Sequence, residues 1–347
     1  MNKVKEFIKS FGWPRIIISL FLLSLFIIAP FVGVSISTSL SDTIVRFGMN
    51  GVMVLAMVPM IQSGCGLNFG LPLGIIAGLL GGTMAIEFNF LGQSSFLMAI
   101  VFATPFALLL GYGYGKLLNK VKGSEMMIAT YVGFSSVAFM CIMWLLLPYS
   151  HPTMVWGYAG KGLRTTISVE GFYLHTLSNF LKINIGDSFL FPTGMILFFI
   201  LLSLLMWAFF HTKRGTAMTA VGSNAVFAKA SGIDVDKTRT LSVMMSTWLG
   251  AVGILVYQQS FGFIQLYMGP FYMALPAVSA ILIGGAAVNK ASIVNVIVGT
   301  FLFQGILTMT PSVMNSMIHT DMSEVIRIVV SNGMILYALT RKSEATQ

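Results

Sequence analysis

Few residues in this sequence could carry out covalent chemistry. Its 347 residues include 11 acids, four histidines and two cysteines. The sequence contains no GxxxxGK[ST] loop for nucleotide phosphates, no HExxH zinc motif and no GxSxG motif of serine hydrolases. No pair of carboxylates lies within an apolar stretch. The sequence therefore predicts that the chain is not an enzyme and binds no metal or cofactor itself.

The remaining reactive groups favour structural roles. Glu87 lies near the end of an apolar segment, where an interfacial carboxylate is more common than a proton relay. A His/Asp/Glu cluster at residues 319–324 could hold a metal ion, but capping and solvation of a helix start is the favoured interpretation. Cys65 and Cys141 lie in apolar segments without a CxxC motif, so we expect small core residues rather than a disulfide.

The composition places these residues in a membrane. Hydrophobic residues make up 56% of the chain and charged residues 9%, whereas soluble domains carry about 25% charged residues. Mean hydropathy is +0.87. Long uncharged runs are typical of membrane helices, which need roughly 20 residues each, and not of the alternating strands of a barrel. We therefore expect an all-α polytopic bundle of about ten transmembrane helices in one domain, residues 1–347.

The distribution of positive charge predicts the topology. The expected spans are 16–34, 47–62, 71–88, 96–114, 125–147, 191–210, 241–257, 271–288, 292–309 and 324–339. Fifteen Lys and Arg residues then fall on the side that we take as cytoplasmic, namely Lys3, Lys5, Lys9, Arg15, Lys116, Lys120, Lys122, Lys213, Arg214, Lys229, Lys237, Arg239, Lys290, Arg341 and Lys342. Five fall outside, namely Arg46, Lys161, Arg164, Lys182 and Arg327. This bias favours two cytoplasmic termini, and it accounts for the net charge of +9 without invoking nucleic acid.

Two interruptions of the apolar segments resemble each other. The first, residues 62–70, and the second, residues 259–270, each begin with Gln-Ser and end at a Gly/Pro helix start. Each restarted segment is expected to end in Gly-Gly, at residues 81–82 and 284–285. Paired interruptions in oppositely directed segments indicate an inverted repeat around a transport site. The alternative is a pair of ordinary Gly/Pro turns.

Two polar stretches lie between the spans. The outer segment, residues 149–190, carries apolar residues at helical spacing (Tyr173, Leu177, Phe180 and Leu181), which predicts a short amphipathic helix. The basic island, residues 212–240 of a cytoplasmic loop at 211–240, carries five Lys or Arg residues. Within it, Asn224 could cap a helix at 225–231 and Gly232 could end that helix. Small alanines, including Ala228, would let the helix sit close to a partner, although a solvated basic loop is the simpler alternative.

The basic island resembles the cytoplasmic loop of ABC importer permeases for ribose, galactose and related sugars, nucleosides and branched-chain amino acids. The matching residues are Val221, Gly222, Ser223, Asn224, Ala228, Ser231, Gly232 and Ile233. The stretches 241–253 and 282–286 are also similar, and the resemblance extends over about residues 47–339. It implies that these eight residues form the helix that couples the permease to its ATP-binding subunit.

The first interruption departs from the sugar permeases of this type. Their usual Gly-Gly-Ile-Asp-Leu-Ser-Val-Gly is replaced by Ser63-Gly-Cys-Gly-Leu-Asn-Phe-Gly, so Asn68 stands near the place of the acid. Asn68 and four glutamines near the interruptions are neutral hydrogen-bonding groups, which suit an uncharged polyol or nucleoside better than an ion. The candidate substrate-pathway residues are Gln62, Asn68, Gln258, Gln259 and Gln265.

The resemblance implies a permease subunit of a bacterial ABC importer that moves a small polar solute, such as a sugar or nucleoside, into the cytoplasm. Its partners would be ATP-binding cassette subunits that hold ATP and Mg²⁺, an extracytoplasmic solute-binding protein and a second permease subunit, identical or not. The location would be the bacterial cytoplasmic (inner) membrane. An ion- or proton-coupled secondary transporter, and a membrane enzyme or receptor scaffold, are the alternatives.

Overall fold

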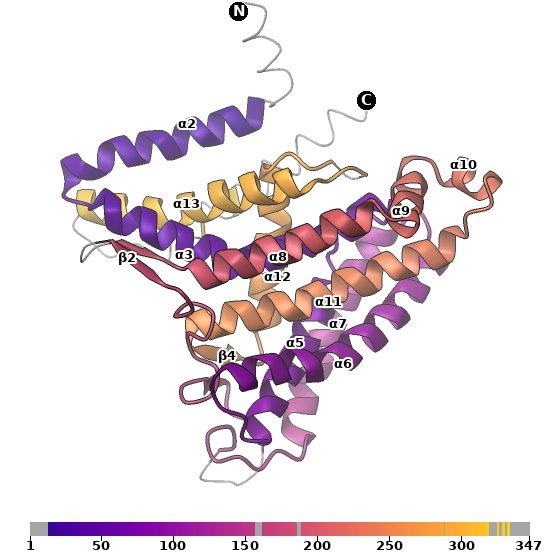
Figure 1. Ribbon diagram of the computed structural model, residues 1–347, viewed down its shortest axis with the longest axis horizontal. Coiled ribbons are helices and arrows are strands. Elements are labelled where there is room, and N and C mark those ends of the chain that lie inside the picture. The colour runs from indigo at the N-terminus through magenta and orange to yellow at the C-terminus, as the bar shows by residue number, and fades with distance from the viewer. Residues whose placement is uncertain are drawn as a thin grey trace, which may run out of the picture.

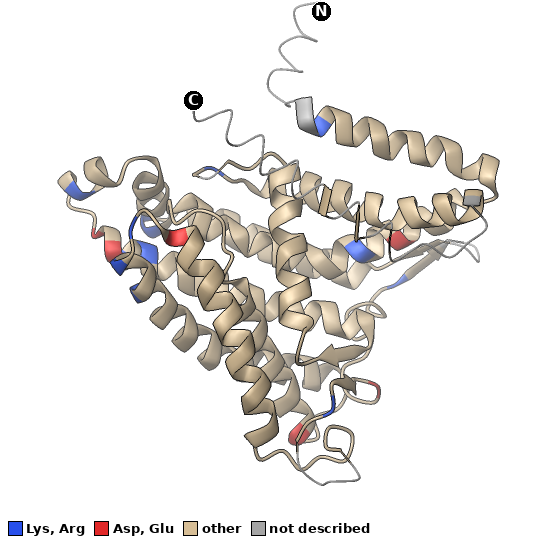
Figure 2. Cartoon of the chain, turned by 180° about the vertical axis from the view of Figure 1, so that it is seen from behind, with Lys and Arg blue, Asp and Glu red and all other residues tan. Residues whose placement is uncertain are grey.

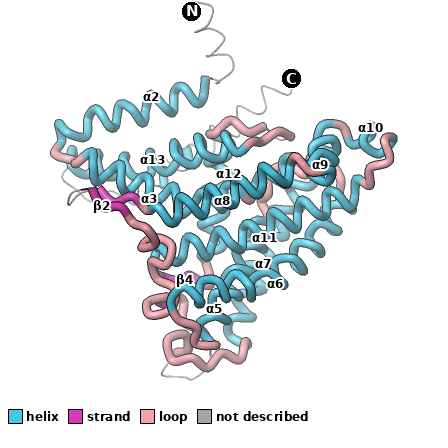
Figure 3. Tube along the Cα trace, viewed as in Figure 1, coloured by secondary structure: helices cyan, strands magenta, loops and turns pink. Residues whose placement is uncertain are grey.

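The computed structural model describes residues 13–156, 162–185, 189–287 and 289–318, and residues 325, 328, 329, 332 and 333 beyond them. The described chain is built almost wholly of helices (Figures 1 and 3). The elements are α2 (Trp13–Ile28), η1 (Ala29–Val32), α3 (Ile36–Leu55), α4 (Met57–Gln62), α5 (Leu71–Glu87), α6 (Gly92–Lys120), α7 (Glu125–Leu146), β1 (Thr166–Ser168), β2 (Ile183–Ile185), β3 (Phe189–Phe191), α8 (Thr193–Phe210), α9 (Lys213–Ser223), α10 (Ala225–Ala230), α11 (Val235–Phe261), β4 (Phe263–Gln265), α12 (Gly269–Ile283) and α13 (Ile293–Ile318).

The expected all-α membrane bundle is confirmed. Within the described residues, seven helical segments are long and apolar enough to cross a membrane, and the apolar helices α5 and α12 are shorter. Together they correspond to the first nine expected spans. The tenth, residues 324–339, lies largely outside the described residues. The 319–324 cluster lies wholly outside them. The second span starts earlier than expected, because the Ser35 hydroxyl accepts from the Thr38 backbone N–H and caps α3, which places Arg46 within a helix.

The core is centred on α11, which packs against α5 and α6 (Figure 1). Glycines allow this close approach. A methyl group on Gly78 of α5 would meet the Ala251 carbonyl oxygen of α11, and one on Gly74 would meet that of Thr247. The four-residue glycine spacing of α5 therefore serves helix packing, as small residues do between helices in lipid.

The peripheral helices α2, α6, α7 and α8 turn apolar side chains outward. Exposed examples are Leu20, Leu109, Leu146 and Leu204. The charged residues gather mainly at the ends of the helices (Figure 2). Exposed apolar flanks with charged ends are what a bilayer requires of a spanning bundle.

Both interruptions are present, and they lie at opposite ends of the bundle. The first break, residues 63–70, separates α4 from α5 beside α9, whereas the second break, residues 262–268, separates α11 from α12 and pairs through β4 with β1 of the outer segment. The two restarted helices begin as expected, with Pro72 and Pro270 in their first turns. The expected Gly-Gly endings are only half right: Gly284 ends α12, but α5 continues past Gly82 to Glu87 because Gly81 and Gly82 pack inside the bundle.

The outer segment does not contain the expected amphipathic helix. Residues 170–181 form successive turns, and His175 has φ +51°. The His175 backbone N–H donates to the Gln259 carbonyl oxygen at 2.6 Å, and those of Leu177 and Ser178 reach the Gln259 side chain. Contacts with α11 have therefore replaced the hydrogen bonds that a local helix would make, and Tyr173 is buried.

Candidate functional site

The basic island folds into three helical starts, each with its own side-chain cap. Thr212 caps α9, Asn224 caps α10 and Asp234 caps α11. The Asn224 carboxamide oxygen accepts from the Phe227 N–H at 2.9 Å, which confirms the predicted cap. Hydrogen bonds from the backbone and then the side chain of Lys237 hold the pKa of the Asp234 carboxyl below its usual range, so the cap is charged near neutral pH.

The carboxyl end of α10 is closed by a Schellman motif. Gly232 has φ +82°, its N–H donates to the Lys229 carbonyl oxygen, and the Ile233 N–H donates to the Ala228 carbonyl oxygen, both at 3.0 Å. This left-handed geometry favours glycine. The prediction that Gly232 ends this helix is confirmed, and the helix is one residue shorter than expected because Ser231 is its C-cap.

The outward face of α10 differs from the expected one. Ala228 is fully buried against the chain itself, so it is not free to meet a partner. Ala225, Lys229 and Ala230 are exposed. The exposed large apolar residues are Val226 and Phe227, at 81% and 68% of their full area. The sequence signal was available, because these are the two adjacent large apolar residues in an otherwise polar stretch. α10 stands at a corner of the molecule, with α9 beside it (Figures 1 and 3).

The amino-terminal part of the predicted coupling residues, positions 221–224, contacts the first break. A methyl group on Gly222 would meet the Gln62 carbonyl oxygen, and one on Gly64 would lie 3.1 Å from the Gly222 Cα. Val221 is buried beside Gly222, whereas Ser223 is exposed and its hydroxyl donates to Thr219. The island and the first break are thus joined by glycine backbone without an intervening side chain.

The predicted pathway residues at the first break are engaged in the core. The Asn68 carboxamide donates to the Ser246 hydroxyl at 2.8 Å and accepts from the Tyr114 hydroxyl at 3.2 Å. The Ser246 hydroxyl donates in turn to the Ala56 carbonyl oxygen at 2.6 Å. The Gln62 carboxamide donates to the Ala291 carbonyl oxygen. In this conformation these groups hold helices together.

The glutamines at the second break face the outer segment. The Gln258 carboxamide oxygen accepts from the Tyr173 hydroxyl at 3.0 Å, and that of Gln259 accepts from Leu177 N–H at 3.1 Å. Both side-chain nitrogens are buried without a partner among the described residues. Gln265 is half-buried in β4 opposite Thr166. The five predicted pathway residues therefore form two groups at opposite ends of the bundle and do not converge on one site.

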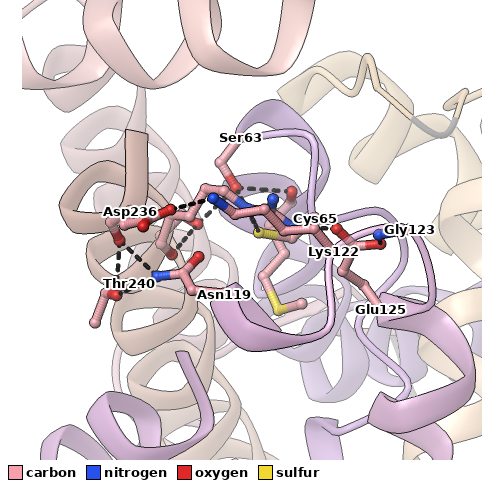
Figure 4. Close-up of polar contacts among 11 residues, drawn as sticks. Ser63, Cys65, Asn119, Lys122, Gly123, Glu125, Asp236 and Thr240 are labelled. Carbon is pink, nitrogen blue, oxygen red and sulfur yellow. Dashed lines mark hydrogen bonds and ion pairs between the residues drawn. The ribbon is translucent and has the colours of Figure 1, made fainter. Parts of the chain in front are cut away.

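A buried charge network beside the first break was missed by sequence reasoning. Arg239 of α11 pairs with Glu125 of α7, and its Nε donates to the Cys65 Sγ at 3.3 Å. The Ser63 and Ser242 hydroxyls lie 2.6 Å apart and join the same region of α11 to the break (Figure 4). The available signal in the sequence was Arg239 itself. A buried guanidinium requires an acidic partner, and the chain contains only 11 Asp and Glu residues from which to choose it.

Glu87, the other notable acid, lies at the end of α5. Its carboxylate accepts backbone hydrogen bonds from Ser150 and His151 at 3.0–3.1 Å and so fastens the start of the outer segment. Among the described residues no group of three or more His, Cys, Asp and Glu could hold a metal ion. Cys65 and Cys141 are not disulfide-bonded.

Comparisons with known proteins agree with this architecture. Over 162 residues the chain is 26% identical to an autoinducer 2 import system permease protein of Enterobacter sp. (strain 638), covering 44% of this chain and 46% of that protein. Over 137 residues it is 27% identical to a tyrosine transport system permease protein of Clostridioides difficile (strain R20291), covering 38% and 45%. The chain thus aligns with slightly less than half the length of these relatives.

A structure described as an inward-facing metal-chelate type ABC transporter superposes with a TM-score of 0.46 at 13% identity, over 94% of this chain and 98% of that one. The family described as branched-chain amino acid transport system, permease component, matches residues 18–338. The chain is therefore a multi-pass membrane protein that belongs to this family of transport-system permease components.

Proposed function

We propose that this chain is the membrane subunit of an ATP-driven importer and that α10 is its contact with an ATP-binding subunit. The observation that carries the proposal is the exposed pair Val226 and Phe227 on a short helix closed at both ends. An aromatic anchor surrounded by polar residues is typical of a protein interface. The subunit makes and breaks no bonds, and ATP and Mg²⁺ are held by the partner.

In this proposal, a displacement of α10 reaches the transport path along the chain in both directions. Towards the amino terminus, α10 continues into α9, whose Gly222 abuts the first break. Towards the carboxyl terminus, α10 leads through Gly232 and Asp234 directly into α11, the central helix of the core. A displacement of α10 therefore moves both sides of the first break, which suits a gate of alternating access.

The complete importer in this proposal contains further subunits. A second permease copy or homologue, two ATP-binding subunits and an extracytoplasmic solute-binding protein complete it. The single permease domain lies in the bacterial cytoplasmic membrane with both termini inside. The outer segment, 149–190, and the coupling loop, 211–240, face opposite sides, in accord with their contacts at opposite ends of the bundle.

The transported solute in this proposal is small, polar and uncharged, of the sugar or nucleoside class. The candidate pathway residues at the two breaks, such as Asn68, Gln258 and Gln259, carry carboxamides, and the charged pair Arg239–Glu125 stands beside the first break rather than within it. Two buried carboxamide nitrogens at the second break have hydrogen-bond donors to offer to a neutral oxygen-rich solute. Sugars and nucleosides present such oxygens.

The coupling proposal is tested by Phe227→Asp in the assembled importer. We expect ATP-dependent uptake to fall at least about tenfold, since a central aromatic anchor contributes 2 kcal/mol or more to an interface, while the amount of subunit in the membrane is unchanged. Phe180→Asp is the matched control, because Phe180 is an exposed phenylalanine of the outer segment. Unchanged uptake in the Phe227 variant would exclude α10 as the contact.

The solute class and the energy source are tested in inside-out and right-side-out vesicles that contain the whole complex. We expect a sugar or nucleoside to be accumulated only with ATP and its binding protein, and to be unaffected by an uncoupler. Accumulation that persists without ATP and collapses with the uncoupler would instead identify a secondary transporter. Transport of tyrosine but of no sugar or nucleoside would overturn the proposed solute class.

A further inference from the structure

Arg239, in the basic island, is the only Lys or Arg that is buried among the described residues. It lies five positions after the Asp234 cap, in the first turns of α11. Its side chain is 8% exposed and that of its partner Glu125 is 16% exposed. The guanidinium uses two nitrogens for two different partners: Nη2 meets Glu125, and Nε donates to Cys65. Arg239 therefore connects three elements that are far apart in sequence.

These two partners lie on opposite walls of a cleft. The cleft has a volume of about 350 Å³ and is lined on one side by residues 64–66 of the first break and on the other by residues 123–127, where α7 begins. Cys65 belongs to the first wall and Glu125 to the second. The forked guanidinium of Arg239 thus contacts one residue of each lining segment, Cys65 and Glu125, which are labelled in Figure 4.

The burial of this pair makes the bridge costly to break. Removing one partner of a buried ion pair leaves an uncompensated charge, which is strongly unfavourable. A second ion pair, Lys122 with Asp236 at 2.5 Å, joins the α6–α7 connection to α11, but its side chains are 48% and 57% exposed. Exposed pairs are screened by water and salt and contribute little. The structure therefore offers a buried bridge from α11 to α7 and an exposed one from α11 to the connection just before α7.

We propose that Arg239 is a positioning residue that sets the width of this cleft and passes the displacement of α10 to the first break. The start of α11 follows α10 after four residues, 231–234, so a pull on α10 displaces Arg239. Arg239 then carries Cys65 and Glu125 with it, and the break moves together with α7. The displacement of α10 by a partner rests on the proposed function, whereas the bridge from Arg239 to Cys65 and Glu125 does not.

The first test measures the bridge without transport. Cys65 serves as the reporter in a Cys141→Ser background, because the chain has two cysteines and Cys65 is only 2% exposed. Arg239→Lys keeps the charge beside Glu125 but lacks the fork that also reaches Cys65. We expect the rate of Cys65 alkylation by N-ethylmaleimide in membranes to rise about tenfold, which lies within the range of energetic coupling between sites in proteins.

The second test measures coupling in the assembled importer. We expect Arg239→Lys to raise the ATP hydrolysed per solute transported, with assembly and thermal stability close to those of the unaltered protein, which a purely structural role would not do. The double variant Glu125→Gln/Arg239→Gln removes both charges and leaves no orphan charge, and it should behave in the same way. Lys122→Gln and Asp236→Asn are the matched controls and should leave both measurements unchanged.

Two outcomes would overturn the inference. One is alkylation and coupling in the Arg239→Lys and double variants equal to those of the unaltered protein. The other is an equal effect of the exposed-pair controls. If Phe227→Asp leaves uptake intact while Arg239→Lys still exposes Cys65, the proposed coupling function fails and the bridge stands. If Phe227→Asp abolishes uptake while Cys65 remains protected in every Arg239 variant, the coupling function stands and the bridge fails.

Discussion

At the residue scale, two glycines among the predicted coupling residues have different roles. Gly222 is required for space, because any side chain there meets the backbone of the first break. Gly232 is required for conformation, because its φ is +82° while no atom lies within 4 Å of the position where a Cβ would stand. One substitution type applied to both positions therefore separates crowding from backbone strain.

We predict that Gly222→Ala reduces uptake far more than Gly232→Ala. Alanine at 222 pushes against the Gln62 carbonyl, and overpacking of this kind costs about 1–3 kcal/mol. In the proposed function, this contact transmits force to the first break. Alanine at 232 costs about 1–2 kcal/mol of local strain and leaves that contact intact. Uptake normalised to the membrane-inserted subunit makes the comparison. A larger loss at position 232 would contradict it.

Residue roles were predictable where their causes are local. Asn224 and Gly232 act on atoms within five residues, so their types and spacing sufficed. Ala228 was assigned to the wrong face because its burial depends on how α10 packs on the rest of the chain. Arg239 and Glu125 are 114 positions apart, and no pattern in a single sequence pairs them.

At the scale of elements, α6 shows how glycine placement selects a packing face. Gly111 turns towards α11, where an added Cβ would lie 2.9 Å from the Met244 Cα. Gly113, two positions later, has no atom within 4 Å of its Cβ position. The same helix therefore carries one glycine that enables contact and one that does not.

Gly111→Ala should destabilise the protein, and Gly113→Ala should not. At position 111 the alanine forces α6 and α11 apart, at a cost of about 1–3 kcal/mol. At position 113 the alanine restricts the unfolded chain and improves helix propensity by about 0.5–1 kcal/mol. Thermal unfolding of the two purified variants in one detergent measures the difference. Equal melting temperatures would show that α6 and α11 are not held by this contact.

The apolar runs were sufficient to predict which segments form helices. They did not predict where those helices end or how the outer segment folds. Among the described residues, the seven helical segments long enough to span and the shorter apolar helices α5 and α12 stand where the hydropathy pattern predicts spans, since lipid exposure demands apolar runs. The residues of the outer segment carry helical spacing, yet contacts with Gln259 fold them into turns. Tertiary hydrogen bonds thus decided a segment whose local pattern indicated a helix.

At the scale of the whole molecule, each break has its own neighbour. The first break contacts the coupling loop through Gly222, and the second is covered by the outer segment through the β1–β4 pairing. The two ends of the path are therefore connected to different faces of the protein, and α11 runs between them. The candidate pathway residues accordingly form one group at each break.

Fastening the outer segment to the second break should stop transport. Thr166 and Gln265 are register partners, so cysteines at both positions in a Cys141→Ser background should form a disulfide on oxidation. If the second break must open for the solute, oxidation should abolish uptake and a reductant should restore it. Each single-cysteine variant serves as the control. Full uptake by the oxidised double variant would show that this pairing persists throughout the cycle.

The two closed ends of α10 have a consequence for assembly. A six-residue helix is too short to be stable alone, yet Asn224 at one end and Gly232 with Ile233 at the other supply it with hydrogen bonds from its own flanks. The helix is therefore already formed when a partner arrives, and association does not have to bear the entropy of ordering it. In the proposed importer, the ATP-binding subunit should accordingly bind by rigid docking, without any gain of helical signal on mixing.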